Sequence, residues 1–305
     1  MQKSGYKQTF LYESGQALVL VLLSLSVVLT VVLFVLARSV TDISTSTEQA
    51  DSVRAFSAAE AGIEKALITG SNYTNVSIGN NALYSVTVSD YSEGQTTFNY
   101  PSVLLSGDTM TLWFWSHNQD GSLAVSCTAA APCFTGNSLK ICWGKDSSKN
   151  GTTPAIEVSV YYETTPGDLS TVRIGRGTYD PYKSGRITQN SFADFDGDGC
   201  TIDQTTYGFR KTINSLSADL GVPAGSRLLF AKIRMLYNTS VGQNIGFDVS
   251  SSGSTLPSQG QEIVSTGSAG STGTESNRRV SVFKGWPEFF FSGIAIFSPT
   301  GVVKQ

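Results

Sequence analysis

The stretch ALVLVLLSLSVVLTVVLFVLA, residues 17–37, decides the architecture of this chain because its twenty-one residues carry no charge. At ~1.5 Å rise per residue, a helix of this length covers ~30 Å, the thickness of the hydrocarbon core of a bilayer. The apolar region of a secretory signal peptide is shorter, at ~7–15 residues. The stretch therefore predicts one transmembrane helix and not a removable secretory leader.

The charges beside the apolar run predict its orientation. Lys3 and Lys7 precede the run, and Arg38 closes it. Basic residues next to a membrane span favour the cytoplasmic side. We therefore expect a single pass through the cytoplasmic membrane, with the first residues inside and everything after residue 38 outside.

The helix is expected to continue beyond the membrane. Between Arg38 and Leu67 there is no Pro and no Gly before Gly62, and Gly70 supplies a stop signal. Apolar residues recur at three- and four-residue spacing in the second half, at Phe56, Ala59, Ile63, Ala66 and Leu67. We predict one helix over residues 16–68, ~75–80 Å long, whose second half is amphipathic and docks on a domain. A signal-anchor helix followed by a stalk is the alternative.

Two features of this region resemble a known family. Gly15 stands directly before the apolar run, and AFSAAEAGIEKA follows at residues 55–66. Together, residues 12–68 resemble the N-terminal module of type IV pilin-like proteins, and they are most similar to minor pilins of the PilX type and to type II secretion minor pseudopilins. Residues 263–270 and 279–282 carry a second, weaker similarity to the same proteins.

The resemblance implies a processing step and a set of partners. A prepilin peptidase would cut after Gly15, removing residues 1–15 as a leader and leaving Gln16 as an N-terminus that is usually methylated. The mature chain would be a minor pilin-like structural subunit of a type IV pilus or a secretion pseudopilus. Its partners would be the membrane and other pilin subunits, contacted through the N-terminal helix, and its final location would be an extracellular pilus.

The sequence departs from the family pattern at two positions. Gln16 replaces the usual Phe, and Leu20 replaces the Glu that is common at the fifth mature position. A carboxylate is costly in lipid and needs a partner, which in pilus assembly is taken to be the N-terminus of the neighbouring subunit. A subunit with nothing stacked above it does not need that carboxylate. Leu20 therefore favours a tip or assembly-initiating position, with a divergent lineage as the alternative.

The composition favours an extracellular β-rich domain over residues 71–305. Charged residues make up 15% of the chain, which is low, and Ser, Thr and Gly are abundant. The net charge of −3 gives no reason to expect nucleic-acid binding, which requires a basic face. About 235 residues follow residue 70, enough for one large β domain or two small ones.

Runs rich in β-branched and aromatic residues predict the strands of this domain. These runs cover residues 83–88, 110–115, 156–162, 172–174, 227–237, 245–249, 263–265, 280–283 and 289–297. Residues 228–235 are apolar on both faces apart from Lys232 and Arg234, and predict a central strand. Residues 156–162 alternate and predict one wet face. Residues 267–277 read as a mobile loop. The fold class is α+β, a long N-terminal helix packed on a mostly antiparallel β-sheet or β-sandwich.

The four cysteines, Cys127, Cys133, Cys142 and Cys200, all fall in the part expected outside. An even number in an oxidising compartment predicts two disulfides. Three pairings are possible, and the sequence alone does not choose among them. The short spacing of Cys127 and Cys133 favours a local loop, which would leave Cys142 with Cys200. Zinc is the alternative, but the spacings differ from the usual Cys-x2–4-Cys pairs.

The segment DFDGDG, residues 194–199, resembles the start of a calcium loop, with carboxylates at alternate positions before Gly199. The three carboxylates belong to Asp194, Asp196 and Asp198. The twelfth position is Thr205 and not the bidentate Glu, so further ligands would come from the Cys200 carbonyl, from Asp203 or from elsewhere. We predict a weak calcium site. A turn with solvated carboxylates is the alternative.

Nothing in the sequence favours catalysis. The single histidine, His117, follows an apolar strand, and no Gly-x-Ser-x-Gly motif occurs, so we expect no enzyme activity. The aromatic run at residues 286–291 predicts a buried last strand, with an exposed adhesive patch as the alternative. Two functions remain: a filament subunit, or a membrane-anchored extracellular binding and adhesion module. Only the filament subunit requires cleavage at Gly15.

Overall fold

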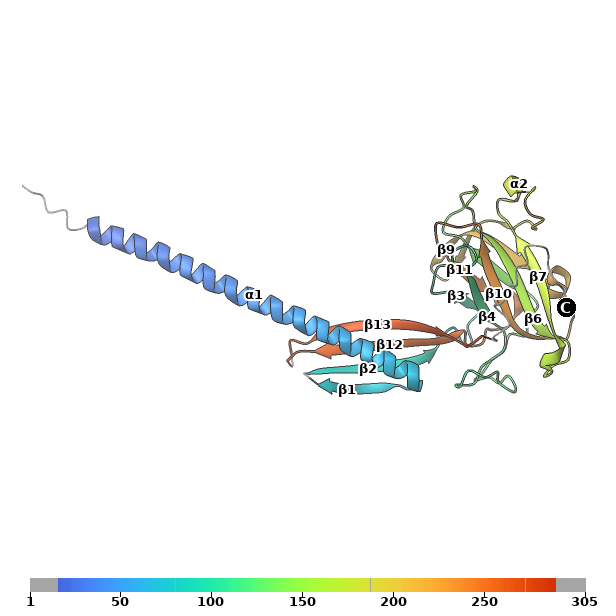
Figure 1. Cartoon of the computed structure of the whole chain (residues 1–305), viewed down its shortest axis with the longest axis horizontal. Helices are drawn as coiled ribbons and strands as arrows, with labels where there is room; N and C mark the ends of the chain where they lie inside the picture. The colour runs from blue at the N-terminus through green and yellow to red at the C-terminus, as the bar shows by residue number, and fades with distance from the viewer. Residues whose placement is uncertain (1–15, 80, 187, 272, 289–305) are drawn as a thin grey trace, which may run out of the picture. The chain divides into compact units, whose positions relative to one another are not determined.

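The computed structural model describes residues 16–79, 81–186, 188–271 and 273–288 (Figure 1). The chain divides into two compact units. The first combines the N-terminal helix as far as Glu64 with Tyr73–Val86 and Ser265–Val280. The second holds Lys65–Asn72, Thr87–Val264 and the segment that begins at Ser281. The region expected as one β-rich domain over residues 71–305 therefore contributes strands to both units.

Helix α1 spans Gln16–Thr69, 54 residues without interruption. It ends where predicted: Gly70 has a φ of 65° and its amide donates to the Ala66 carbonyl oxygen at 2.7 Å. Among the described residues, α1 is the one helix that is long and apolar enough to cross a membrane. This finding fits single-pass anchoring.

The apolar half of α1 leaves no hydroxyl group without a partner. Ser24 donates to the Val21 carbonyl at 2.9 Å, and Thr30 donates to the Ser26 carbonyl at 2.7 Å. Ser26 donates to the Leu23 carbonyl at 2.8 Å. Because the helix itself accepts these protons, the hydroxyls do not oppose burial in lipid.

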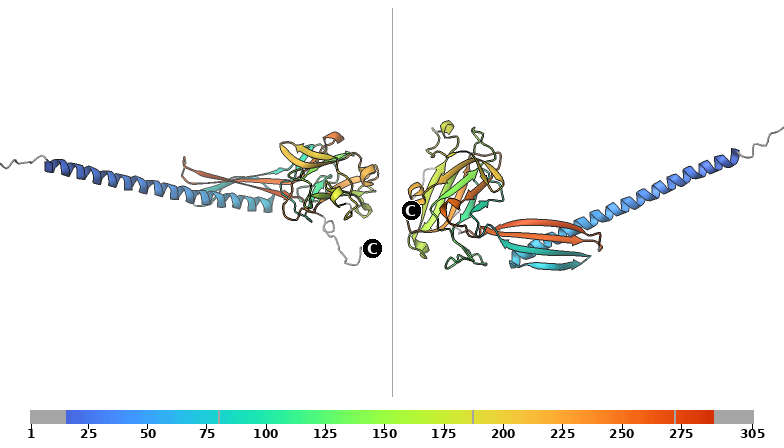
Figure 2. Two further views of the ribbon diagram at one scale, coloured as in Figure 1. Left: turned by 90° about the horizontal axis from the view of Figure 1, so that it is seen from above. Right: turned by 180° about the vertical axis from the view of Figure 1, so that it is seen from behind.

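The first unit is built on a four-stranded sheet of order β1-β2-β12-β13, with α1 lying along one face (Figures 1 and 2). Its strands are Tyr73–Gly79, Ala82–Asp90, Gly260–Ala269 and Ser276–Gly285. Along β2 the buried residues Ala82, Tyr84 and Val86 alternate with more exposed ones. The sheet therefore buries the face that carries α1 and leaves its other face wet.

The second unit is a β-sandwich of two antiparallel sheets. One sheet has the order β4-β10-β6-β7, formed by Thr109–Trp113, Arg227–Leu236, Ala155–Glu163 and Val172–Tyr179. The other has the order β3-β11-β5-β9-β8, formed by Thr97–Asn99, Ile245–Asp248, Leu139–Trp143, Thr205–Ile213 and Gly197–Ile202. Short helices lie in the connections: α2 (Lys183–Arg186), α3 (Leu216–Leu220) and two 3₁₀ turns, Leu169–Thr171 and Ser250–Ser252.

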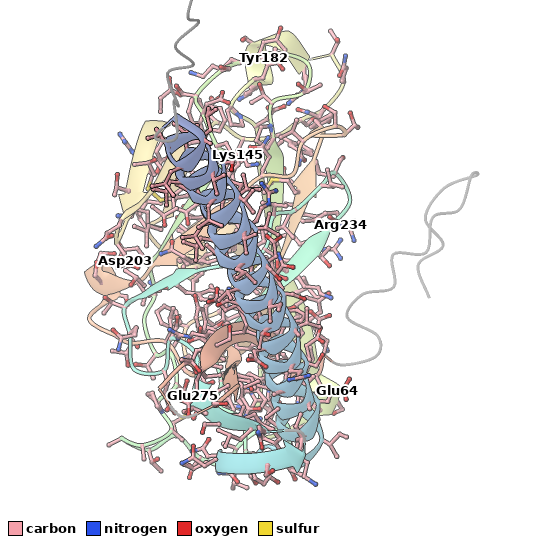
Figure 3. The ribbon with its side chains drawn as sticks, turned by 90° about the vertical axis from the view of Figure 1, so that its left-hand side faces the viewer. Glu64, Lys145, Tyr182, Asp203, Arg234 and Glu275 are labelled. Atoms are coloured by element: carbon pink, nitrogen blue, oxygen red, sulfur yellow. A yellow bond between two sulfur atoms is a disulfide. The ribbon has the colours of Figure 1, made fainter. Side chains whose placement is uncertain are left out.

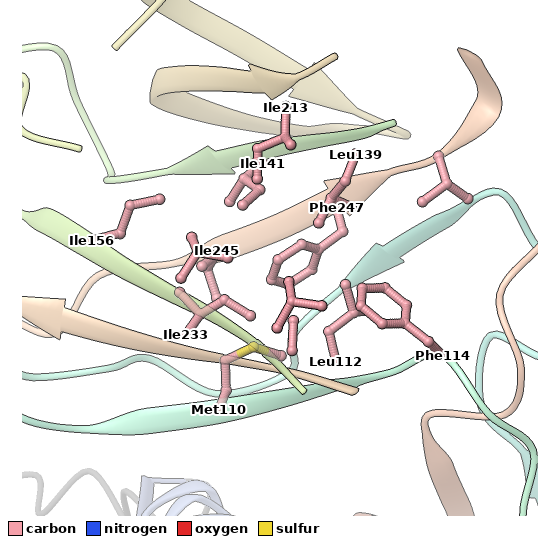
Figure 4. Close-up of a cluster of buried hydrophobic side chains, with 14 of the residues drawn as sticks. Met110, Leu112, Phe114, Leu139, Ile141, Ile156, Ile213, Ile233, Ile245 and Phe247 are labelled. Atoms are coloured by element: carbon pink, nitrogen blue, oxygen red, sulfur yellow. The ribbon is translucent and has the colours of Figure 1, made fainter. Parts of the chain in front are cut away.

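Aliphatic and aromatic side chains from the two sheets meet in one core (Figure 4). Ile156 and Ile233 face Ile141, Ile245 and Phe247 of the other sheet, and all five are completely buried. Such a core forms where the apolar inner faces of two sheets pack against each other. Hydrophobic burial of this kind holds the sandwich together.

The sequence located most of the strands, and it placed β10 correctly in the middle of its sheet, between β4 and β6. Strands β1, β3, β5, β8 and β9 were not predicted. Three of them are short or contain Gly and Asp, so pairing with neighbouring strands and not intrinsic preference makes them strands. The strand expected over residues 289–297 lies outside the described residues.

The expected wet face of the strand at residues 156–162 is partly covered. Ser159 is buried, and Tyr161 stacks on Phe230 with ring centroids 4.5 Å apart. Beside them, Glu288 pairs with Lys232 and Thr111. The segment after β13 therefore covers part of this outer face.

Candidate functional site

Small side chains hold α1 against the sheet of the first unit. Ala55, Ala58, Ala59 and Ala66 have no exposed surface. At the contact with Gly267 of β12, an added Cβ would overlap the Ala55 carbonyl oxygen and lie 2.5 Å from the Ala59 nitrogen. The helix backbone thus touches the strand directly, and only glycine fits at position 267.

Gly62 provides a second close approach in the same interface. A Cβ there would overlap Ser265 Oγ and lie 2.8 Å from Cδ2 of Tyr84. Near the start of the docked half, Arg278 of β13 donates to the Ser52 hydroxyl at 2.8 Å and 2.6 Å. The docked half of α1 is therefore fixed by close packing along its length and by a polar contact at its beginning.

The buried stripe of α1 differs from the predicted one. Ala59, Ile63 and Ala66 are buried as expected, but Phe56 is 46% exposed and Leu67 is 37% exposed. The backbone of α1 lies too close to β12 for large side chains to fit between them, so alanines occupy the docked face. The signal in the sequence was the recurrence of Ala and Gly at three- and four-residue spacing.

An apolar stripe remains uncovered on the other side of the same helix half. Val53 and Phe56 are exposed, and Leu67 lies on the same side about three turns after Phe56. Glu60 and the labelled Glu64 lie on the same exposed side (Figure 3). The two glutamates lie between Phe56 and Leu67 along this side. Exposed apolar residues grouped on one side of a helix are a feature of surfaces that meet a partner.

Only one side of the predicted processing site lies within the described residues. Gly15 lies outside the described residues, and Gln16 is the first residue of α1. Leu20 is exposed, as are the other large apolar residues of the first half of α1. Cleavage after Gly15 therefore stays a prediction.

The three carboxylates of the predicted calcium loop bind separate lysines. Asp194 pairs with Lys183 at 3.1 Å and Asp198 pairs with Lys149 at 2.9 Å. Asp196 pairs with a third lysine, Lys211, at 2.7 Å. Each carboxylate is thus paired with its own lysine.

The groups around Asp196 favour the ionised form of its carboxyl group. Burial raises the pKa of Asp196, but hydrogen bonds from Lys211 and from Thr212 outweigh that effect, so the pKa lies below its ordinary value. The Thr212 amide donates to Asp196 Oδ2 at 2.6 Å. The carboxylate is therefore satisfied by groups of strand β9.

The second half of the Asp-rich segment belongs to a strand and not to a loop. Strand β8 begins at Gly197 and pairs with β9. Asp203, at the turn between the two strands (Figure 3), accepts hydrogen bonds from Thr97 at 3.1 Å and Asn99 at 3.0 Å. Within the described ranges, no three His, Cys, Asp or Glu side chains come together to hold a metal. As these side chains lie, they do not fit a calcium ion, and the site stays an untested prediction.

The disulfides pair as the spacing favoured. Cys127 bonds to Cys133 with Cα atoms 5.5 Å apart, and Cys142 bonds to Cys200 with Cα atoms 5.9 Å apart. The second bond joins β5 to β8 across the intervening strand β9. All four cysteines of the chain are therefore bonded.

His117 lies in an aromatic cluster. Its ring stacks on Trp286 at 5.2 Å and meets the edge of Trp113 at 4.3 Å between centroids. Burial lowers the pKa of His117 to about 4, so the ring is neutral at physiological pH. Trp286 is buried and donates from Nε1 to the Ser258 carbonyl at 3.0 Å. The start of the aromatic run is therefore core, and the part after Glu288 lies outside the described residues.

A buried ion pair in the sandwich was missed from the sequence. Arg186 Nη1 binds Asp180 Oδ1 at 2.8 Å, and both side chains are almost fully buried. The same guanidinium donates to the carbonyls of Gly151 and Thr153, at 2.9 Å each. The two charged residues are only 6 positions apart, but the carbonyls that complete the contact come from a loop 33 to 35 residues earlier, so no local pattern in the sequence predicts this buried pair.

The helix and its docked sheet are the part of the chain on which a proposal about function can be based. Its geometry is a long apolar helix continued by a small-residue interface. Comparisons with protein-family models, with curated proteins and with solved structures each find no match for this chain.

Proposed function

We propose that this chain is a minor pilin-like structural subunit of a type IV pilus or a related secretion pseudopilus, placed at the tip or at the start of assembly. One observation carries the proposal: the exposed apolar half of α1 continues without a break into a half docked by Ala and Gly on a sheet. A signal anchor with a stalk needs neither the continuity nor the docked face.

The two halves of α1 would serve different steps. Before assembly, the apolar half lies in the bilayer, with the rest of the chain outside. After extraction, the same surface must be covered again, because exposing it to water costs ~25 cal/mol per Å². Helices of neighbouring subunits would cover it, and the stripe at Val53, Phe56 and Leu67 would extend that contact.

The position at the tip is argued from Leu20. With Leu at this position, the membrane half of the described helix has no carboxylate to pair with the N-terminus of another subunit. Such a subunit accepts neighbours on one side. Low abundance relative to the shaft subunit follows from that position.

A membrane-anchored binding module is the second candidate, and the topology supplies its support. Residues 91–259 lie between β2 and β12, which are neighbours in the first sheet, and these residues hold all the strands of the sandwich. A disulfide-bonded sandwich inserted into a helix-and-sheet module is well suited to carry a binding surface. The two candidates are compatible in a tip subunit, but only the filament role requires processing.

Mass spectrometry of the protein recovered from cells tests the filament role. We expect a mature N-terminus at Gln16, usually methylated, and accumulation of the longer species in Gly15→Val. Ser14→Ala, next to the cleavage site, is the matched control and should mature normally. A wild-type chain that retains Met1, with no shorter form, would refute the proposal and leave the anchored module.

A further inference from the structure

The part of α1 between its apolar half and its docked half is exposed to solvent along its whole length. Residues 39–50 are all exposed, and burial begins at Asp51, which is 8% exposed. Figures 1 and 2 show that the N-terminal part of α1 extends well beyond the ends of the four strands of its sheet. We propose that residues 39–47 form an extensible joint, which is helical in the absence of force and lengthens when the chain is pulled.

The composition of the joint disfavours a helix. Residues 39–47 read SVTDISTST, so all nine are Ser, Val, Thr, Asp or Ile. These five types have a lower helix propensity than Ala, Leu, Glu or Lys, because β-branched side chains lose rotamers in a helix and Ser, Thr and Asp compete for backbone hydrogen bonds. The docked half differs, since AAEAGIEKA at residues 58–66 contains four alanines. The joint is therefore the part of α1 with the weakest intrinsic preference for a helix outside the membrane.

The side-chain contacts of the joint add little to its stability. Thr41 Oγ1 donates to the carbonyl four residues earlier at 3.0 Å, and Thr47 Oγ1 does the same at 2.9 Å. Bonds of this kind slightly destabilise a helix and often bend it. Arg38 and Asp42 form an ion pair at 3.9 Å, but their side chains are 73% and 72% exposed, so the pair contributes little.

Two opposing factors decide between the helical and the open form of the joint. Each residue of these types lowers the helix–coil equilibrium by a factor of about 2–3 relative to alanine, which accumulates to roughly 10³ over the whole joint. Opening the joint creates a new helix start, and nucleation disfavours that step by a similar factor of ~10³. Because the two factors are of the same order, a small force is enough to open the helix.

The parts of α1 on either side of the joint are held as helix by other forces. Lipid favours helix over residues 17–37, because no water is present there to bond to an open backbone. On the other side, Ala55, Ala58 and Ala59 have no exposed surface, and the helix backbone touches β12. Opening that begins in the joint therefore stops at both of its ends, and neither the membrane span nor the docked half is released.

Opening the joint makes the chain longer. A helix rises ~1.5 Å per residue, whereas an extended chain spans up to ~3.3–3.6 Å per residue, so the joint gains up to about 16–19 Å. The docked half of α1 then moves away from the span while the span stays where it is. In the filament role, which rests on the proposed function, the joint would lengthen as α1 is pulled from the membrane.

The joint itself does not depend on the filament role. A membrane-anchored binding module with the same α1 would contain the same joint, because the argument uses only residues 39–50 and their neighbours in the helix. Failure of processing at Gly15 would leave the joint intact. A rigid helix over residues 39–50 would overturn the joint and leave the filament role intact.

Hydrogen–deuterium exchange, followed by mass spectrometry on the full chain in lipid nanodiscs, tests the joint. The backbone amides of residues 43–50 bond to carbonyls of the joint and its border, and those of residues 59–66 belong to the docked half. After correction for intrinsic rates, we expect the first group to exchange about 100-fold faster than the second or more, because packing protects only the docked half.

An alanine variant separates low helix propensity from mere exposure. It carries four substitutions at exposed positions of the joint: Ser44→Ala, Thr45→Ala, Ser46→Ala and Thr47→Ala. The variant keeps the helix exposed but raises its propensity, so exchange over residues 43–50 should slow by about tenfold or more. Ser57→Ala/Glu60→Ala, at exposed positions of the docked half, is the matched control and should leave exchange over residues 43–50 unchanged.

A distance measurement follows the length of the joint directly. Spin labels at Arg38→Cys and Ala50→Cys, both exposed, would lie ~18 Å apart along an unbroken helix. In pulsed electron resonance we expect the wild-type distances to extend beyond this value, and those of the alanine variant to stay close to it.

Three results would overturn the proposal. One is exchange over residues 43–50 that is as slow as exchange over residues 59–66, which would mean that α1 is a rigid rod. Another is exchange that the alanine variant leaves as fast as in the wild type, which would mean that helix propensity does not decide the opening. The third is a single helical distance between the two labels in the wild-type chain.

Discussion

Gly62 and Gly267 are the residues at which the contact between α1 and its sheet is closest. Adding a methyl group at either position forces the helix away from β12, because the atoms it meets include backbone and a packed tyrosine ring. Overpacking of this kind costs about 1–3 kcal/mol. We expect Gly267→Ala to lower the free energy of unfolding by this amount in denaturant titrations of the full chain in detergent.

Ser57→Ala is the control for this prediction. Ser57 lies on the exposed side of the same helix turn. A change there should stay within about 0.5 kcal/mol. Equal effects of Gly267→Ala and Ser57→Ala would contradict the close contact.

The Arg186–Asp180 pair makes a second prediction at the residue scale. Removing one partner leaves a buried charge uncompensated, which costs about 3–5 kcal/mol. We expect Arg186→Met to destabilise the sandwich by this amount in the same titration. Lys183→Met removes the exposed pair with Asp194 and should cost less than about 1 kcal/mol. A smaller effect for Arg186→Met than for Lys183→Met would refute the buried role.

The burial of His117 should make the stability of the folded chain depend on pH. Its pKa is lowered by burial from 6.5 to about 4, so the unfolded chain binds this proton more readily than the folded chain. Stability due to this group is therefore fully present above pH 6.5 and declines as the pH falls toward about 4. The melting temperature should fall less over this window in His117→Phe. Parallel pH profiles for wild type and variant would show that the ring is not buried.

At the scale of elements, the two disulfides close loops of different length. The Cys142–Cys200 bond spans 58 residues and the Cys127–Cys133 bond spans 6. Loop-closure entropy then gives about 4 kcal/mol for the first and about 2 kcal/mol for the second. We expect the double variant Cys142→Ala/Cys200→Ala to unfold at clearly lower denaturant than Cys127→Ala/Cys133→Ala. The reverse order would contradict this assignment of stability.

The β8–β9 hairpin shows why the surroundings of the three carboxylates could not be predicted from the sequence. Alternating carboxylates before a glycine resemble a calcium loop, but part of the segment pairs with β9, and each carboxylate pairs with a lysine from another segment of the chain. Calorimetry at millimolar calcium decides whether an ion displaces those lysines. Spacing alone does not show which cation neutralises a carboxylate.

The strands illustrate the same limit. Strand β10 was predictable because a short run that is apolar on both faces is typical of a strand buried on both sides of its sheet. Strand β8 was not, because Gly and Asp are poor strand formers and only β9 makes them extended. The small-residue face of α1 was partly visible as recurring alanines. The partner residues Ser265 and Gly267 were hidden, because about two hundred residues separate them from the helix.

At the scale of the whole molecule, the chain joins two modules in an interrupted order. The helix and its sheet are completed only when β12 and β13 return after the sandwich. The docked helix therefore depends on segments from both ends of the chain. We expect a truncation after residue 259 to leave α1 without β12 and to be degraded in cells, whereas the full chain accumulates.

We propose that α1 assembles this chain into a filament after cleavage at Gly15. The most direct measurement is to shear filaments from cells and probe both the sheared fraction and the membrane fraction for the chain. We expect a small amount of chain beginning at Gln16 in the sheared filaments, labelled by immunogold at one end, and none in Gly15→Val. A chain found wholly in the membrane fraction with Met1 intact would contradict it.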